Sequence, residues 1–138
     1  MNNLRIQRIP QHPSLREYIK DIWIFESDGR LSEDEMRIVA PNGSLKMILH
    51  YQEGVVGQIG NHTFPVRENQ LSIVGICDSP TIADFDRTRP FGCISIEFHP
   101  RTAYHLLPVP QHELKNAIFP LWEVYGKNFT SPMSVLQK

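Results

Sequence analysis

The sequence predicts a mainly β domain, a meander or small barrel of short strands followed by two or three short helices. Up to about residue 99, short apolar runs alternate with turn residues at close intervals, which is the pattern of a β-meander. After Phe98 the pattern changes, because Pro100 suits the first turn of a helix and an apolar patch follows it. The length of 138 residues fits one domain with its own hydrophobic core.

The N-terminal part predicts a short helix that leads into a strand. Ser14 and Glu17 form a capping-box pattern, so we expect a helix to begin there. An apolar residue then recurs at the spacing of one helix face, at Leu15, Tyr18, Ile19 and Ile22. The run from Asp21 to Glu26 is β-branched and aromatic and predicts a strand.

Turn residues divide the next segment into further strands. Asn42-Gly43 is the strongest turn signal, and it predicts a hairpin between strands at 36–40 and 45–51. Another strand is expected at 55–59, and apolar runs predict three more at 71–76, 81–85 and 93–98. In the last of these strands, Ile94, Ile96 and Phe98 face one way and Cys93, Ser95 and Glu97 the other. This alternation is typical of a half-buried strand.

Proline and glycine delimit the helices expected in the last third of the chain. The first runs from Pro100 to Pro108, the second follows Pro110 through Ala117, and the third spans 121–125 with Gly126 as its stop. The remaining residues, 127–138, resemble a linker that runs into another helix.

The composition excludes several classes of protein. Fourteen Lys and Arg against fifteen Asp and Glu give a net charge of -1, which lacks the basic excess of a domain that binds nucleic acid by itself. No apolar segment suits a signal peptide or spans a bilayer, so we expect a cytoplasmic protein without a membrane partner. Cys77 and Cys93 form no CxxC pair, which argues against a disulfide framework or a zinc ribbon.

The reactive side chains form no recognisable catalytic motif. The sequence has no GxSxG elbow, no phosphate loop and no carboxylate pair placed for acid–base chemistry. A metal centre would need histidines brought together from separate strands, because no HxH or HExxH occurs among His12, His50, His62, His99, His105 and His112. We therefore assign no catalytic residue, metal site or cofactor, and expect that the chain is not an enzyme. His50 stands out because it shares a strand face with Ile48 and Lys46.

The order of these elements resembles a known family. A capped helix leads into the strand with Trp23, Pro41-Asn42-Gly43 precedes an apolar strand, and Gly92 opens the strand that ends in Phe98-His99-Pro100. Further matching positions follow, at Ala103, Leu106-Leu107-Pro108, Pro110, Glu113-Leu114 and 121–126. From about Pro13 to Gly126 the chain resembles the N-terminal, non-DNA-binding domain of AraC-type (AraC/XylS) transcriptional regulators.

The resemblance implies a small cupin-like β-barrel followed by helices, over residues 1–126, that senses a signal or mediates dimerisation. In such regulators a separate C-terminal domain with helix-turn-helix units binds DNA, and residues 127–138 would lead towards it. The expected function is transcription regulation by a homodimer that binds an unknown small-molecule effector and reaches DNA only through a domain absent from this chain.

Four residues are candidates to line the effector pocket, because an apolar barrel with a few polar groups makes a small-molecule site. They are Trp23, Phe25, His50 and Phe98. Each would serve equally well in a filled core. Two other functions stay open: a stand-alone cupin-type enzyme with a metal in its barrel, and a purely structural dimerisation module.

Overall fold

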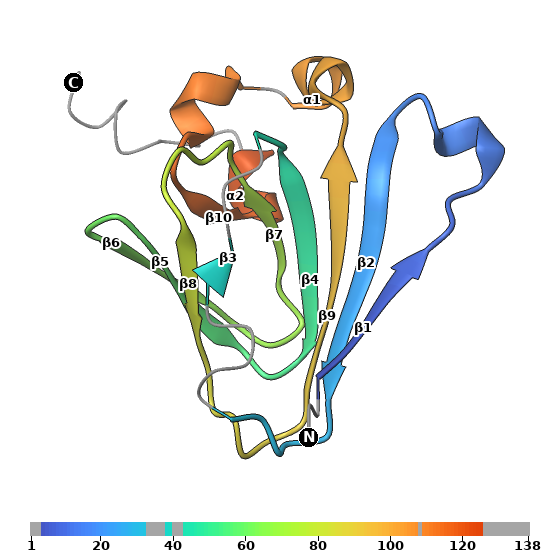
Figure 1. The fold of residues 1–138 in the computed structure, drawn as a ribbon. Helices are drawn as coiled ribbons and strands as arrows, with labels where there is room; N and C mark the ends of the chain where they lie inside the picture. The colour runs from blue at the N-terminus through green and yellow to red at the C-terminus, as the bar shows by residue number, and fades with distance from the viewer. Residues whose placement is uncertain (1–3, 33–37, 40–42, 108, 126–138) are drawn as a thin grey trace.

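Two β-sheets face each other, and short helices gather at one end of this sandwich (Figure 1). The computed structural model describes residues 4–32, 38–39, 43–107 and 109–125. The predicted mainly β fold with short helices is confirmed.

The larger sheet has six strands, and each neighbouring pair is antiparallel. In spatial order, its strands are β1 (Leu4–Ile9), β2 (Ile19–Ser27), β9 (Phe91–Phe98), β4 (Lys46–Gln52), β7 (Leu71–Val74) and β10 (Ile118–Pro120). Strands β9 and β4 therefore lie at the centre, although 38 residues of chain separate Gln52 from Phe91.

The smaller sheet has four antiparallel strands. Their order is β3 (Ile38–Val39), β8 (Thr81–Asp84), β5 (Val55–Ile59) and β6 (His62–Val66). A tight turn joins β5 to β6, and Gly60 in that turn has φ of 60°, a left-handed conformation that glycine adopts without strain.

The helices are short and flank the strands. A single 3₁₀ turn, η1 (Pro13–Leu15), lies between β1 and β2. After β9 come α1 (Pro100–Leu106), η2 (Gln111–Leu114) and, after β10, α2 (Leu121–Val124). A Cβ on Gly75 would lie 1.7 Å from the backbone oxygen of Leu114, so only glycine allows η2 to pack this closely against the end of β7.

The apolar residues form two clusters on opposite faces of the six-stranded sheet. The outer cluster joins strand residues near one end of the sheet to the C-terminal segment: Leu45, Ile73, Phe98, Leu107, Leu114, Ala117, Phe119 and Val124. The inner cluster lies between the two sheets: Leu31, Val55, Val66, Phe85, Phe91 and Cys93. The six-stranded sheet therefore buries side chains on both faces.

Two of the predicted local structures are wrong. The expected helix from Ser14 is only the three-residue turn η1, because Nδ1 of His12 accepts from the backbone N–H of Ser14 (3.2 Å) and the chain enters β2 at Ile19. The expected hairpin between 36–40 and 45–51 does not form either. Its first strand is seen only as β3, which pairs with β8 in the other sheet; residues 36, 37 and 40 lie outside the described ones.

The other predicted strands are confirmed with modest changes of boundary. The expected strands at 45–51, 55–59, 71–76, 81–85 and 93–98 correspond to β4, β5, β7, β8 and β9. Strands β1, β6 and β10 were not predicted. Each lies at an edge of its sheet, and β6 and β10 contain a proline.

The predicted helices after β9 are confirmed in position but are shorter than expected. The second ends at Leu114 as a 3₁₀ turn instead of continuing to Ala117, because Ile118 to Pro120 pair with β7. Gly126 and the proposed linker at 127–138 lie outside the described residues.

Replacement of Phe98 by Ala is expected to lower the free energy of unfolding by about 3–5 kcal/mol, because the ring is only 7% exposed within the outer cluster. The control is Leu106→Ala, which removes an exposed side chain from α1 and should change the free energy by about 0.5 kcal/mol or less. Urea unfolding measures both. Equal, small effects would show that Phe98 does not support the core.

Candidate functional site

A cavity of ≈ 520 Å³ lies between the two sheets. The six-stranded sheet contributes most of its wall, and Val55, Gly57, Val66, Thr81 and Ala83 close it from the four-stranded sheet. The volume is in the range of small-molecule sites, and most of the lining is apolar with a few polar groups.

Three of the four candidate pocket residues line this cavity. Trp23 and Phe25 project from the same face of β2, and His50 projects from β4. The strand register places Phe25 opposite Cys93 on β9, and Cys93 opposite His50, so these three residues form one row across the sheet. Trp23 and Phe25 are two residues apart, and residues two apart on a strand project from the same face of the sheet.

Phe98 does not line the cavity, which corrects its selection as a pocket residue. Alternation along β9 directs Cys93, Ser95 and Glu97 into the cavity, while Phe98 packs in the outer cluster below the C-terminal segment. The polar face of this strand is therefore the one turned towards the cavity.

Sequence reasoning missed the polar residues of the cavity wall. Lys46 and Glu97 are cross-strand partners and both line it, as do Ser72, Ser95 and Thr81. Ser72 and Ser95 are buried, and Ser72 accepts a hydrogen bond from Nε2 of Gln70 (2.9 Å). The alternation in 93–98 was the available signal, but it is also the pattern of a strand with one face in water.

His50 is the most unusual side chain of the cavity. It is 7% exposed, and its ring meets Phe91 edge to face with 6.0 Å between ring centroids. Nδ1 of His50 is shielded from solvent and has no hydrogen-bond partner among the described residues. Burial lowers the pKa of His50 from 6.5 to about 4, so the imidazole is neutral at pH 7.

The wall around His50 is apolar. Phe91 is fully buried and stacks on Phe85 with 4.3 Å between ring centroids. The guanidinium of Arg87 lies over the ring of Phe85, 4.7 Å from its centroid. Burial raises the pKa of Cys93 to about 12, so its thiol stays protonated and acts as a small apolar group rather than as a nucleophile.

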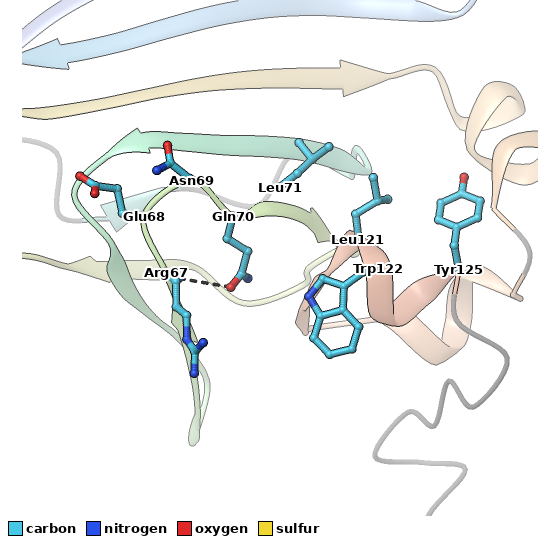
Figure 2. A pocket seen from close by; sticks show the side chains of 8 residues that line it. All are labelled: Arg67, Glu68, Asn69, Gln70, Leu71, Leu121, Trp122 and Tyr125. Atoms are coloured by element: carbon cyan, nitrogen blue, oxygen red, sulfur yellow. Dashed lines mark hydrogen bonds between the residues drawn. The ribbon is translucent and has the colours of Figure 1, made fainter.

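A second hollow lies on the surface, outside the sandwich. Figure 2 shows the side chains that line this groove, from the turn at 67–71 and from the segment 121–125. Its volume is ≈ 590 Å³. The backbone N–H of Arg67 donates to Oε1 of Gln70 (3.3 Å) and shapes the turn, and Trp122 is 74% exposed at the opposite side. The groove is wide open to solvent, whereas the cavity holds the candidate residues, and we therefore take the cavity as the candidate site.

The remaining histidines do not gather at either hollow. Nε2 of His99 lies 3.1 Å from the backbone oxygen of Arg16, and His12 caps η1. Within the described part of the chain, no three His, Cys, Asp or Glu side chains are grouped so that they could hold a metal ion. In the same residues, no helix is long and apolar enough to cross a membrane.

The facing sheets and the hollow between them define a cupin-like β-sandwich domain. The chain belongs to a family described as a domain of unknown function, DUF6597, which matches residues 7–120. A comparison with curated protein sequences found no match.

Solved structures with the same fold are distant in sequence. The Cupin_2 domain of an XRE-family transcriptional regulator from Enterobacter cloacae has a TM-score of 0.53 at 14% identity, over 72% of this chain and 100% of that one. An HTH_3-family transcriptional regulator from Vibrio cholerae has 0.52 at 12% identity, over 72% of this chain and 52% of that one. The Cnp3 cupin domain of Schizosaccharomyces pombe has 0.52 at 7% identity, over 76% and 71% of the two chains. At these identities the similarity establishes the fold alone.

The stability of the domain should depend on pH through His50. Its pKa is lower in the folded protein than in the unfolded chain, so the unfolded chain binds the proton first as the pH falls. Stability is therefore full above pH 6.5 and declines as the pH falls from 6.5 to about 4, by about 3 kcal/mol for this group.

The measurement is urea unfolding of the wild type and of His50→Leu at a series of pH values between 4 and 7.5. Subtracting the two curves removes the contribution of the other titrating groups. If the curves run parallel, His50 is not a buried neutral imidazole.

Proposed function

We propose that this chain is the regulatory domain of an AraC-type transcriptional regulator, and that it binds a small molecule between its two sheets. The observation that carries the proposal is the cavity of ≈ 520 Å³ between the sheets, which is largely apolar and has a few polar groups in its wall. DUF6597 is a domain known from AraC-type regulators, which supports the resemblance found in the sequence. Two of the structural neighbours are described as transcriptional regulators.

In this function the domain performs no catalysis. The bound molecule favours one arrangement of the domain over another, and an attached helix-turn-helix domain would bind DNA differently in the two arrangements. The net charge of -1 agrees with a domain that does not itself hold DNA.

The proposal predicts that at least one member of a metabolite panel raises the melting temperature of the domain. At a hundred times its dissociation constant, a ligand of the folded state adds about 2.7 kcal/mol of stability, which corresponds to several degrees. Differential scanning fluorimetry measures the shift.

Two substitutions place the binding site. Ala83→Phe puts a large ring on the cavity wall and should abolish the shift, whereas Val56→Phe adds a ring at an exposed position of β5 and should preserve it. A shift that survives in Ala83→Phe would place the ligand elsewhere, and a panel without any shift would favour a structural module.

The proposal includes a homodimer, the state that the resemblance implies. The exposed apolar side chains of Trp122 and Tyr125, at α2, are the surface to test. The hydroxyl of Tyr125 donates to the backbone oxygen of Leu106 (2.8 Å) and so connects this surface to α1.

Sedimentation equilibrium is expected to give a dimer for the wild type and a monomer for Trp122→Glu, because a buried, unpaired charge opposes association. Tyr18→Glu, at an exposed aromatic residue before β2, is the control and should remain dimeric. A monomeric wild type would refute the dimer, and a dimeric Trp122→Glu would exclude this surface as its interface.

A further inference from the structure

Two opposite charges lie side by side in the wall of the cavity between the sheets. Lys46 on β4 and Glu97 on β9 are partners in the strand register, and both line the cavity. Partner positions on neighbouring antiparallel strands are about 5 Å apart. Both side chains are only partly buried, so this part of the wall is charged without being closed off from solvent.

The ammonium of Lys46 is available to a ligand. None of the ion pairs among the described residues includes Lys46. Its Nζ is also absent from the polar atoms of those residues that are shielded from solvent and lack a hydrogen bond. Asp21, which pairs in register with Glu97 on the other side, is compensated by Arg8 at 2.6 Å and leaves Lys46 to other anions.

Glu97 can bind a ligand in addition to any contact that it makes with the protein. A carboxylate has two oxygens and accepts about four hydrogen bonds, so one protein partner does not exhaust it. The wall therefore offers a donor and an acceptor of opposite charge on adjacent strands.

The next row of the sheet is apolar enough to hold a hydrophobic group. Trp23, Ser95 and Ile48 are in register with one another, two residues along their strands from the charged row, which is about 7 Å. All three line the cavity, and Ala83 lines it from the facing sheet. The small side chains of Ser95 and Ala83 leave room between the sheets, and Trp23 and Ile48 supply apolar surface.

The two charges select a molecule that carries both signs. A carboxylate bound to Lys46 lies one strand away from Glu97, which repels it, and an ammonium bound to Glu97 is repelled by Lys46 in the same way. An uncharged apolar molecule removes water from both charged groups and pairs with neither. A zwitterion pairs with both, because its carboxylate accepts from Nζ of Lys46 and its ammonium donates to the carboxylate of Glu97.

We infer that the ligand of this domain is a zwitterionic α-amino acid with an apolar side chain, held by ion pairs to Lys46 and Glu97 and packed against Trp23 and Ile48. The ammonium and the carboxylate of an α-amino acid share one carbon atom, which suits two charges on adjacent strands. The inference rests on the proposed function, because it names the class of molecule that the cavity binds.

Three probes with the same apolar part test the inference by isothermal titration calorimetry of the wild type at pH 7.5. They are phenylalanine, phenethylamine, which lacks the carboxylate, and hydrocinnamate, which lacks the ammonium. Leucine, isoamylamine and isocaproate form a second series with a smaller side chain. In at least one series the amino acid should bind about tenfold more tightly than either relative, the factor that one charge-assisted hydrogen bond provides. Equal binding within both series would overturn the inference.

Lys46→Met removes the cation and keeps a side chain of similar length. This variant should bind the amino acid no more tightly than the amine that lacks the carboxylate. Lys20→Met is the matched control, because it makes the same change at an exposed position of β2, and it should keep the tenfold preference. A preference that persists in Lys46→Met would contradict the inference.

Glu97→Gln removes the anion and keeps the shape of the side chain. It should bind the amino acid no more tightly than the acid that lacks the ammonium. Glu17→Gln, at an exposed position before β2, is its control and should behave as the wild type. If Glu97→Gln also behaves as the wild type, Glu97 does not bind the ammonium and the inference is wrong.

The outcomes separate the inference from the proposed function. If neither amino acid binds, while another member of the metabolite panel raises the melting temperature and Ala83→Phe abolishes that shift, the inference fails and a ligand-binding cavity stands. If neither the probes nor any member of the panel binds, the inference and the small-molecule function fail together.

Discussion

The central constraint of this fold is that β9 and β4, at the middle of the six-stranded sheet, carry buried or half-buried side chains on both faces. Antiparallel pairing fixes their register, and the register fixes which side chains go to which face. A shift of one residue would move Phe98 into the cavity and Glu97 into the apolar cluster under the helices. The cavity and the C-terminal segment are therefore two results of one pairing.

Local pattern was sufficient to predict most strands but not their partners. The apolar runs of β4, β5, β7, β8 and β9 are bounded by turn residues, and each forms a strand near its expected place. The edge strands β1, β6 and β10 carry weaker patterns, and only pairing with a neighbour makes them strands. The sequence could not predict the partner of β3. The turn signal at Gly43 predicts that the chain bends there, but it does not determine which strand pairs with β3 when the sheets assemble.

The same distinction explains the candidate site. An aromatic or imidazole side chain on a strand usually lies in a core or in a pocket. This allowed the selection of Trp23, Phe25 and His50 from the sequence, and the structure brings all three to one wall of the cavity. Phe98 has the same pattern, but the helices that follow β9 cover its face. Lys46, Ser95 and Glu97 could not be recognised, because a polar strand face turned to a cavity has the same sequence as one turned to water.

The proposed regulation needs a physical connection between the cavity and the end of the chain, and β10 supplies one. This strand is three residues long: Ile118 lines the cavity, Phe119 packs in the outer cluster, and Pro120 is the N-cap of α2. A Cβ on Gly57 would lie 2.7 Å from Cδ1 of Ile118, so the Ile118 side chain packs directly against the backbone of β5 in the facing sheet. A ligand that contacts Ile118 therefore acts on a short strand that leads directly into α2. Coupling requires only that this contact has a different free energy in two positions of the strand, and the contact of Ile118 with Gly57 would change if the strand moved.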